Sequence, residues 1–420
     1  MEKVSIIGLG YVGLPLALLT AKKGFDVTGI DLDGDKVVKI NSRKDPLQDE
    51  FVATHLKDSS LKASTNFNSI PASSIVIICV PTPVQHDYQP DLKPLQGATK
   101  AAAEKISKNT LVIIESTINP GVSDEIIIPL IEKESGMKVN KDFYVSHCPE
   151  RINPGDTKWN VSNIPRVAGS SNEVGLARTV SFYEAIVDAT ILPMQCLKEA
   201  EAVKVVENSF RDINIAFVNE LAKSFTKLGI NVKNVIDGAS TKPFAFMPHY
   251  PSVGVGGHCI PVDPYYLIEY ARGYGFEHEF LSLARSINNS MPEFTVEQLI
   301  DGLNEVGTSL KGSRIAVLGL SYKANVADDR ESPSYKLINI LQDKGATVET
   351  YDPYFPEKST AKSLEKALQQ KDAVVIATNH TEFISADYSA HNIKVLVDGK
   401  NCLDSVETQK APYIYRGIGT

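Results

Sequence analysis

The chain has 420 residues, which at about 150 residues per domain suggests two or three domains. Its formal net charge of −8 argues against nucleic acid or an anionic membrane as a partner, although it does not exclude a small anionic substrate held by local Lys and Arg. The apolar run Val4–Ile7 so close to the start, and the absence of about 18 successive apolar residues, argue against a signal peptide and a spanning helix.

Short apolar runs alternate with helical stretches through the first half of the chain. Such alternation favours an α/β fold with a parallel sheet covered by helices on both faces. The expected strands are Val4–Ile7, Val27–Ile30, Ile75–Val80, Leu111–Ile114 and Phe143–Val145, with Val167 and Ile191–Leu192 as further candidates.

The first strand runs into the motif GxGxxG, formed by Gly8, Gly10 and Gly13 with Leu9, Tyr11 and Val12 between them. Gly8 permits a tight turn, Gly10 lets the backbone approach a pyrophosphate, and Gly13 allows close helix packing. Asp31 follows the second strand, where a carboxylate accepts hydrogen bonds from ribose hydroxyls and repels a 2′-phosphate. The spacing therefore predicts a site for NAD rather than NADP.

From Cys196 to about Leu228 the pattern changes to one long helix. Its apolar stripe consists of Val203, Val206, Phe210, Ile213, Phe217, Leu221, Phe225 and Leu228. A helix of this length bridges domains, builds a dimer interface, or simply packs in a core. Lys204 and Asn208 share one face, with Arg211 close by, and an ammonium and an amide there could stabilise an oxyanion.

Five cysteines are scattered through the chain, which indicates reduced thiols and a cytoplasmic protein. They are Cys79, Cys148, Cys196, Cys259 and Cys402. The adjacent His-Cys pairs at 147–148 and 258–259 lack the spacing of structural zinc sites, so we expect no metal.

Cys259 lies in a glycine-rich loop between prolines, which is poor core material. Gly254, Gly256 and Gly257 allow close backbone approach to a ligand and leave the thiol accessible, and Asp263 follows four residues after the cysteine. The alternative is a buried, inert cysteine. His258 is a candidate base for the thiol, but adjacent side chains commonly diverge.

A second strand–helix–strand pattern begins with Ser313–Leu320 and continues through a helix near Ser334–Lys344 to Thr347–Tyr351, followed by Asp352. It repeats the start of the chain without GxGxxG. The repeat predicts two nucleotide-binding-type domains joined by a helical middle, of which the second binds something other than a dinucleotide.

Together these motifs resemble the UDP-glucose/GDP-mannose dehydrogenase family. The resemblance runs through GLGYVGLPLA, CVPTP, ESTINPG, the Pro149-Glu150 element, KVVENSFRDINIAFVNE, GVGGHCIPVDPYYL and KANVADDRESPS. It implies an NAD-binding Rossmann domain at 1–195, a helical dimerisation domain carrying catalytic residues at 196–302, and a UDP-sugar-binding Rossmann-like domain at 303–420. A homodimer through the central helix is expected, and a uronate product would suit polysaccharide biosynthesis.

The resemblance also implies roles for single residues. Cys259 would be the nucleophile, Lys204 and Asn208 the oxyanion stabilisers, Asp263 the partner orienting Lys204 or a water, Glu150 the base of hydrolysis, and Thr117 the residue positioning that water. Cofactor contacts would be Gly8, Gly10, Tyr11, Val12, Gly13, Asp31, Thr82, Thr117 and Arg330. Substrate contacts would be Glu150, Arg151, Lys204, Asn208, Arg211, His249, Gly256, His258 and Lys323.

The chemistry explains why such an enzyme needs a cysteine among these residues. An aldehyde has no second easily removed hydride until a thiolate adds to it.

The substrate branch is indicated by other segments. The sequences GGHC and ERINPG resemble the branch acting on UDP-N-acetylhexosamines, and Phe244–Pro248 favours UDP-N-acetylglucosamine. The alternatives are UDP-N-acetylmannosamine and, further off, UDP-glucose. Whether His249 or Arg151 replaces an arginine that the UDP-glucose branch draws from its partner subunit stays open. Rival hypotheses are a two-electron hydroxyacid dehydrogenase and a non-catalytic sensor.

Overall fold

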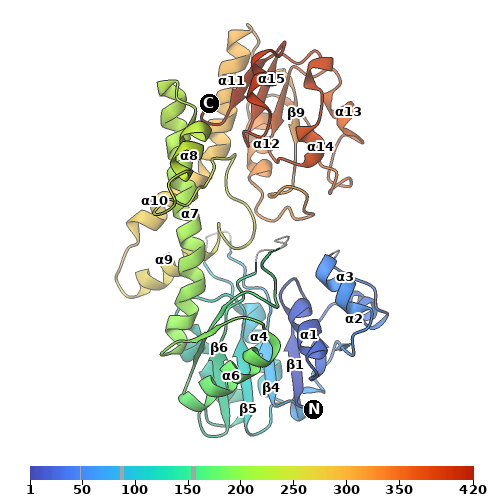
Figure 1. Ribbon diagram of the computed structural model, residues 1–420, viewed down its shortest axis with the longest axis vertical. Coiled ribbons are helices and arrows are strands. Elements are labelled where there is room, and N and C mark those ends of the chain that lie inside the picture. The colour runs from blue at the N-terminus through green and yellow to red at the C-terminus, as the bar shows by residue number, and fades with distance from the viewer. Residues whose placement is uncertain (48, 86–88, 153–157) are drawn as a thin grey trace. The chain divides into compact units, whose positions relative to one another are not determined.

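The computed structural model describes residues 1–47, 49–85, 89–152 and 158–420. The chain divides into two compact units (Figure 1). Unit 1 consists of Met1–Glu207 and Tyr265–Phe276, and unit 2 of Asn208–Pro264 and Glu277–Thr420.

Unit 1 is built around a sheet that has eight strands among the described residues, in the order β3-β2-β1-β4-β5-β6-β7-β8. The strands are β1 (Lys3–Ile7), β2 (Asp26–Ile30), β3 (Lys62–Ser64), β4 (Ile75–Ile78), β5 (Thr110–Ile114), β6 (Phe143–His147), β7 (Arg166–Ser170) and β8 (Ile191–Pro193). The helices are α1 (Gly13–Lys22), α2 (Gly34–Asn41), α3 (Glu50–Leu56), α4 (Lys93–Ala103), α5 (Ile128–Ser135) and α6 (Glu173–Ile186), with the short turns η1 (Ile70–Ala72) and η2 (Ser123–Ile127).

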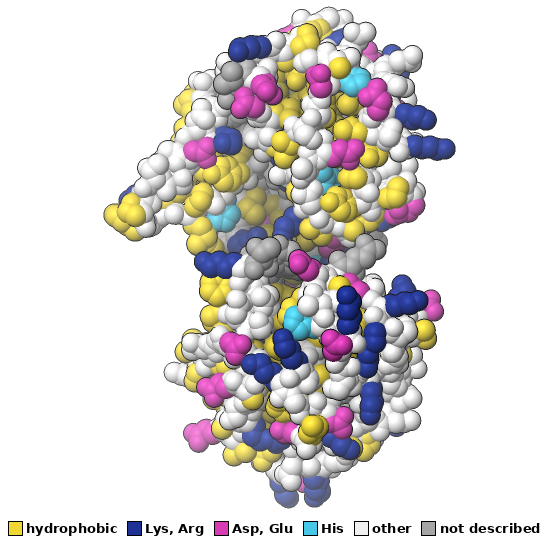
Figure 2. Space-filling model, turned by 45° about the vertical axis from the view of Figure 1, so that its right-hand side comes forward, with side chains coloured by type: hydrophobic (Ala, Val, Ile, Leu, Met, Phe, Trp, Pro, Cys, Tyr) yellow, Lys and Arg dark blue, Asp and Glu magenta, His cyan; other side chains and the backbone are white. Residues whose placement is uncertain are grey.

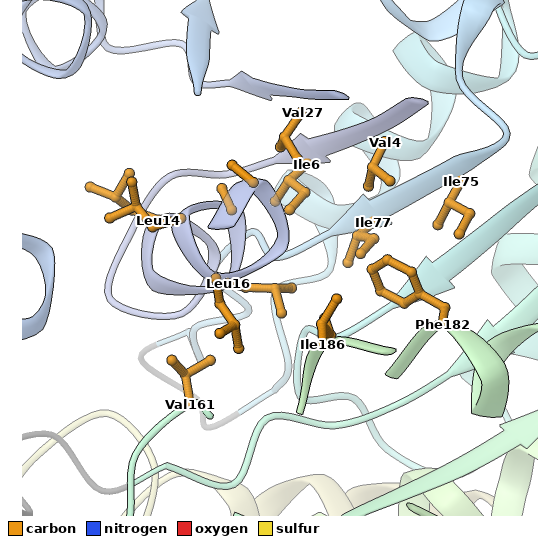
Figure 3. Packing of buried hydrophobic residues seen from close by; sticks show 14 of the residues in the cluster. Val4, Ile6, Leu14, Leu16, Val27, Ile75, Ile77, Val161, Phe182 and Ile186 are labelled. Atoms are coloured by element: carbon orange, nitrogen blue, oxygen red, sulfur yellow. The ribbon is translucent and has the colours of Figure 1, made fainter. Parts of the chain in front are cut away.

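Alternate residues of the central strands face opposite sides of the sheet, as the two-residue period of a strand requires. Ile6 and Ile77 pack with helices α1 and α6, whose contributions include Leu14, Leu16, Phe182 and Ile186 (Figure 3). Their neighbours, among them Ile7, Val76 and Ile78, pack with α4 and α5 on the other face. Each fully buried side chain of this size contributes about 1.5–3 kcal/mol, so both faces must be covered for unit 1 to fold.

The strands expected from the apolar runs are confirmed, including the two further candidates around Val167 and Ile191. The short edge strand β3 was not expected, because Lys62–Ser64 carries no apolar run. The sheet is also not wholly parallel, since β7 runs antiparallel to β6.

Unit 2 contains a second sheet, which among the described residues has five parallel strands in the order β10-β9-β11-β12-β13. The strands are β9 (Arg314–Leu318), β10 (Thr347–Tyr351), β11 (Ala373–Ile376), β12 (Val395–Asp398) and β13 (Ile414–Gly417). The helices are α8 (Val232–Ser240), α10 (Glu279–Asn289), α11 (Met291–Glu305), α12 (Pro333–Asp343), α13 (Leu364–Leu368), α14 (Thr381–Ile384) and α15 (Ser405–Gln409), with the turn η3 (Tyr388–Ala390). Helices α7 (Leu197–Leu228) and α9 (Asp263–Gly273) have residues in both units.

The two sheets repeat the same turn after their first strand. The Gly8 amide donates to the carbonyl of Ile30 at 2.7 Å, and the Gly319 amide donates to the carbonyl of Tyr351 at 2.9 Å. Both glycines have positive φ angles, +92° and +103°, where a side chain would be strained. The expected fold class, two Rossmann-like domains with a long-helix segment between them, is confirmed.

Helix α7 confirms the predicted long helix, but most of its apolar stripe does not lie in the core. Phe210 and Phe217 are 47% and 53% exposed, and Val206 and Leu228 are also exposed. The buried positions are others, among them Val205, Ala216, Val218 and Ala222. The exposed apolar face of α7 therefore consists of Val206, Phe210, Phe217 and Leu228, whereas Leu221 and Phe225 pack against the core of unit 2.

The surface of unit 1 carries local clusters of positive charge that the negative net charge of the chain does not reveal. In the lower part of Figure 2, dark blue Lys and Arg side chains lie close together although the chain's formal net charge is −8. Among the described residues, no helix combines the length and apolar character that crossing a bilayer requires.

Two glycines in helices of unit 1 provide a stability test of the first turn. A Cβ on Gly13 would lie 1.9 Å from the carbonyl oxygen of Gly8, whereas a Cβ on Gly97 in α4 would meet nothing within 4 Å. We expect Gly13→Ala to lower the free energy of unfolding by about 1–3 kcal/mol, and Gly97→Ala to raise it by up to about 1 kcal/mol. Denaturant unfolding of both variants is the measurement, and equal effects would contradict the packing described for Gly13.

Candidate active site

The glycine turn of unit 1 leaves room for a ligand at one position. A Cβ on Gly8 would lie 2.7 Å from the carbonyl oxygen of Cys79, so Gly8 serves the protein's own packing. Gly10 has no heavy atom within 4 Å of such a Cβ, and it directly precedes the N-terminal turn of α1. Backbone amides at a helix start bind phosphate, so this open space fits a dinucleotide pyrophosphate. Tyr11 is exposed and Val12 half-buried at the same turn.

Asp31 follows β2 and closes the turn from the other side. Its Oδ2 accepts from the Leu9 amide at 2.8 Å and from Lys36 Nζ at 2.9 Å. Partial burial alone would raise the pKa of Asp31, but hydrogen bonds from the Asp33 amide, Lys36 and the Leu9 amide hold it below its usual value. The carboxylate stays ionised, as a ribose-hydroxyl acceptor should be.

Thr82 and Thr117 are brought together at the sheet edge where β4 and β5 end. Thr82 Oγ1 donates to the carbonyl of Thr117 at 2.6 Å. Tyr266 on α9, which had no role in the sequence analysis, donates its hydroxyl to the carbonyl of Thr82. These expected residues therefore occupy the carboxyl edge of a parallel sheet, where ligands of doubly wound folds bind.

Glu150 lies three residues beyond β6 and is buried, 6% exposed. Its Oε1 accepts from the amides of Arg151 at 2.5 Å and Ile152 at 2.7 Å. Its Oε2 accepts from Arg166 Nη2 at 2.7 Å. Arg151 pairs with Glu207 and donates to the carbonyl of Pro165. The rest of the expected element, Asn153–Gly155, lies outside the described residues.

The sequence analysis did not predict a role for three buried polar residues near Glu150, which are Glu115, Arg166 and Tyr183. Arg166 Nη1 donates to Glu115 Oε1 at 3.0 Å, and Tyr183 donates its hydroxyl to the same oxygen. Glu115 is the first letter of the motif ESTINPG, but Arg166 and Tyr183 lie in no motif, so only the fold connects them.

Helix α7 carries Lys204 and Asn208 one turn apart. Lys204 is half-buried and belongs to unit 1, while Asn208 is buried and belongs to unit 2. Within unit 2, Asn208 Nδ2 donates to Asp263 Oδ2 at 2.5 Å. We expected Asp263 to orient Lys204 or a water; the side-chain partner seen for it within unit 2 is instead the Asn208 amide.

Cys259 is half-buried rather than sealed in a core, and His258 beside it is exposed. The carbonyl of Cys259 accepts from the amides of Val262 at 3.1 Å and Asp263 at 2.8 Å, which closes a tight turn. This turn brings Asp263 back toward the cysteine backbone. The start of the loop is tied to α7, because the Ser252 amide donates to Asn219 Oδ1 at 3.0 Å.

The glycines of this loop pack closely against another segment of unit 2. A Cβ on Gly256 would lie 2.5 Å from Cβ of Tyr322, and one on Gly254 2.9 Å from Pro333. The Gly257 amide donates to the carbonyl of Arg330 at 2.9 Å. We expected these glycines to admit a ligand; their nearest neighbours are instead the protein's own residues around Tyr322, which hold the loop in place.

Charged groups gather around Tyr322. Burial, Asp328 and Cys259 raise the pKa of the Tyr322 hydroxyl, while Arg330 and Arg211 oppose that rise. Arg330 is paired with Asp328 through Nε at 2.9 Å and Nη2 at 2.6 Å. The expected ligand contacts Arg211 and Arg330 therefore lie in the electrostatic neighbourhood of the cysteine loop.

The two remaining expected substrate contacts are also half-buried in unit 2. His249 lies with Nδ1 3.0 Å from the carbonyl oxygen of Met247, and Lys323 directly follows Tyr322.

Three family models match the chain in sequence order. All describe the UDP-glucose/GDP-mannose dehydrogenase family: its NAD binding domain over residues 2–187, its central domain over 198–290 and its UDP binding domain over 316–405. The match agrees with the geometry, since the glycine turn and Asp31 lie in the first segment and the cysteine loop in the second.

Similar proteins cover the whole chain. The UDP-N-acetyl-D-mannosamine dehydrogenase of Pyrococcus horikoshii is 36% identical over 99% of both chains, and its solved structure superposes with a TM-score of 0.93 over 100% of this chain and 99% of that one. The UDP-N-acetyl-D-glucosamine 6-dehydrogenase of Pseudomonas aeruginosa is 35% identical over 96% of this chain and 95% of the relative. The structure of the UDP-N-acetyl-mannosamine dehydrogenase Cap5O of Staphylococcus aureus has a TM-score of 0.85 at 31% identity, covering 100% and 98% of the two chains. The chain therefore belongs to the UDP-glucose/GDP-mannose dehydrogenase family and is an NAD-dependent nucleotide-sugar dehydrogenase.

Proposed function

We propose that the enzyme oxidises the C6 hydroxyl of a UDP-N-acetylhexosamine, with UDP-N-acetylglucosamine favoured, to the uronate in a four-electron reaction. The observation that carries the proposal is the loop of Cys259, whose thiol is half-buried in a glycine-rich turn instead of packed in a core. A two-electron dehydrogenase has no use for such a thiol. The five scattered cysteines support a cytoplasmic location for this chemistry.

Named residues of this chain act in the steps of the proposed reaction. NAD would supply the hydride acceptor, one molecule for each of the two oxidation steps. The Cys259 thiolate adds to the C6 aldehyde to give a thiohemiacetal, which after the second oxidation is a thioester. Lys204 and Asn208 stabilise the oxyanions, with Asp263 orienting the Asn208 amide. Glu150 takes a proton from the hydrolytic water, which Thr117 positions, and the acid is released.

Two lines of support favour an N-acetylhexosamine over glucose. The chain has GGHC and ERINPG, which resemble the N-acetylhexosamine branch. Similar proteins are named for UDP-N-acetyl-D-mannosamine at 36% identity and for UDP-N-acetyl-D-glucosamine at 35%. The choice of UDP-N-acetylglucosamine rests on Phe244–Pro248, and its C2 epimer is the alternative.

Counting reduced cofactor tests the role of the cysteine. The wild-type enzyme should form two NADH per sugar, and Cys259→Ser should lose acid formation by at least about 1,000-fold because a serine hydroxyl is a much weaker nucleophile. Cys196→Ser, at an exposed cysteine of unit 1, is the matched control and should behave like wild type. One NADH per sugar in the wild-type enzyme would end the four-electron mechanism.

A panel of UDP-sugar substrates tests the assignment to the UDP-N-acetylhexosamine branch of the family. Turnover of UDP-N-acetylglucosamine should exceed that of UDP-glucose by at least about tenfold in kcat/KM, since a site that holds the acetamido group leaves polar groups unpaired without it. UDP-N-acetylmannosamine belongs in the same panel. A higher kcat/KM for the manno epimer would select the alternative, and comparable turnover of UDP-glucose would overturn the branch assignment.

We further propose a homodimer in which a second copy covers the apolar face of α7. The support is the exposure of Phe210 and Phe217 on α7, together with exposed Phe280 and Leu283 on α10 of the same unit. Large exposed aromatic and aliphatic side chains are enriched at interfaces between protein chains.

A charge on this face should break the dimer. Phe217→Glu is expected to shift the sedimentation mass toward the 45.8 kDa monomer, because a carboxylate cannot be buried unpaired in an apolar interface. Val174→Glu, at a 51% exposed position on α6, is the matched control and should leave the mass unchanged. A dimer that survives Phe217→Glu at micromolar concentration would place the interface elsewhere.

A further inference from the structure

One guanidinium is shared by two carboxylates in the interior of unit 1. The side chains of Arg166 and Glu115 are 0% exposed and that of Glu150 is 7% exposed. Arg166 donates from Nη1 to Glu115 at 3.0 Å and from Nη2 to Glu150 at 2.7 Å, so each carboxylate takes one arm of the fork. Such charge-assisted pairs are strong when water is excluded.

Glu150 is tightly held in this arrangement, because its carboxylate accepts from two backbone amides and from Arg166. For Glu150 to take a proton from water, something must weaken the hold of Arg166. The geometry supplies one candidate, which is the competing carboxylate of Glu115.

The surroundings of Glu115 allow its charge to change near neutral pH. Burial and the neighbouring Glu150 raise the pKa of Glu115 to about 7, against the opposing effects of Arg166 and of the Tyr183 hydroxyl. The other titratable groups around it are Cys79, whose Sγ lies 4.0 Å from Oε2, and Cys148. Two carboxylates and one guanidinium would carry a net negative charge in this interior, so one proton is held there at low pH.

We propose that Arg166 and Glu115 are positioning residues that control how tightly Glu150, the proposed base of thioester hydrolysis, is held by the buried guanidinium. When Glu115 is protonated, the charge of Arg166 serves Glu150 alone. When Glu115 is ionised, the guanidinium is shared between the two carboxylates, so its hold on Glu150 weakens and the carboxylate is released to act on water. The inference rests on the proposed function of Glu150.

The proton balance of hydrolysis fits this arrangement. An O–H bond of water breaks, its proton goes to Glu150, the water oxygen bonds to the thioester carbon, and the Cys259 thiolate leaves. Neutral Glu150 then needs no cation, and ionised Glu115 remains paired with Arg166. The buried group stays charge-balanced while the base holds its proton, which an apolar interior requires.

The pH dependence of kcat tests the inference. The wild-type kcat should rise with pH through the region near 7, where Glu115 loses its proton. Glu115→Gln is locked in a form resembling the protonated acid, so its kcat at pH 8 should fall by about tenfold or more with little change in KM, and the rise near pH 7 should disappear. More Cys259 thioester should also accumulate, measured by mass spectrometry after acid quench.

Two further variants separate this role from a structural one. Tyr183→Phe removes a donor that favours ionised Glu115, so its kcat profile should keep the rise but shift it to higher pH. Glu201→Gln removes another buried carboxylate of unit 1, one that accepts from the Gly121 and Ser123 amides, and should cost stability without altering the shape of the profile. Wild-type profiles in both Glu115→Gln and Tyr183→Phe would overturn the inference.

Unfolding measurements keep the test independent of catalysis. A carboxylic acid with a folded pKa of about 7 contributes stability below its unfolded pKa that is lost as pH rises through about 7. The thermal midpoint of the wild type should therefore fall relative to Glu115→Gln between pH 5 and pH 8, and a constant difference would overturn the coupling. If Glu150→Gln instead keeps full turnover, the assignment of Glu150 as base fails while this titration still stands.

Discussion

The reversal of one strand places the charges on which the proposed hydrolysis depends. In a wholly parallel sheet, the seventh strand would begin at the edge opposite the ligand-binding one. Because β7 is antiparallel to β6, its first residue, Arg166, lies at the edge where β6 ends. The register pairs Ser146 with Ser170 and His147 with Gly169, and continuing it beyond β6 puts Glu150 opposite Arg166. The reversal of β7 thus brings Arg166 to the edge at which Glu150 follows β6, where the two side chains form their hydrogen bond.

The two Rossmann-like sheets show the same turn put to different uses. In unit 1 the Asp31 carboxylate accepts from the Leu9 amide and remains half-buried, so a ligand can still reach it. In unit 2 the corresponding Asp352 is fully buried and accepts from the Leu320 and Ser321 amides, the Ser321 hydroxyl and His380. Although burial opposes it, these donors hold the pKa of Asp352 well below its usual range. The two corresponding aspartates therefore differ in role: Asp31 would bind a ribose in unit 1, whereas Asp352 holds the turn of unit 2 together.

The sequence predicted those parts of the molecule whose signals are local. Apolar runs located the strands, GxGxxG located the turn at Gly8, and the three-and-four spacing located α7. Interactions between distant segments could not be read in this way. Nothing near Arg166 indicates that its strand reverses, and nothing in Ser252–Asp263 indicates that its glycines face Tyr322 and Pro333. The charge state of Glu115 depends on burial and on Arg166 of β7, Tyr183 of α6 and Glu150 beyond β6, so it is set only once the sheet is assembled.

Helix α7 buries polar as well as apolar side chains in unit 2. Its buried side carries Asp212 and Asn219, which join α10 through Arg285 at 2.6 Å and Asn288 at 2.8 Å and lead on to the backbone of Ser252. Val206, Phe210, Phe217 and Leu228 of its apolar stripe are left exposed. Buried polar groups are tolerated because each of these contacts supplies a partner, and the network fixes the start of the cysteine loop to the helix. An exposed row of Phe and Leu has no such compensation, since each side chain gains about 1.5–3 kcal/mol only when water is removed. Helix α7 thus ties its polar side to the start of the Cys259 loop, and the proposed dimer would use the exposed apolar side chains of the same helix.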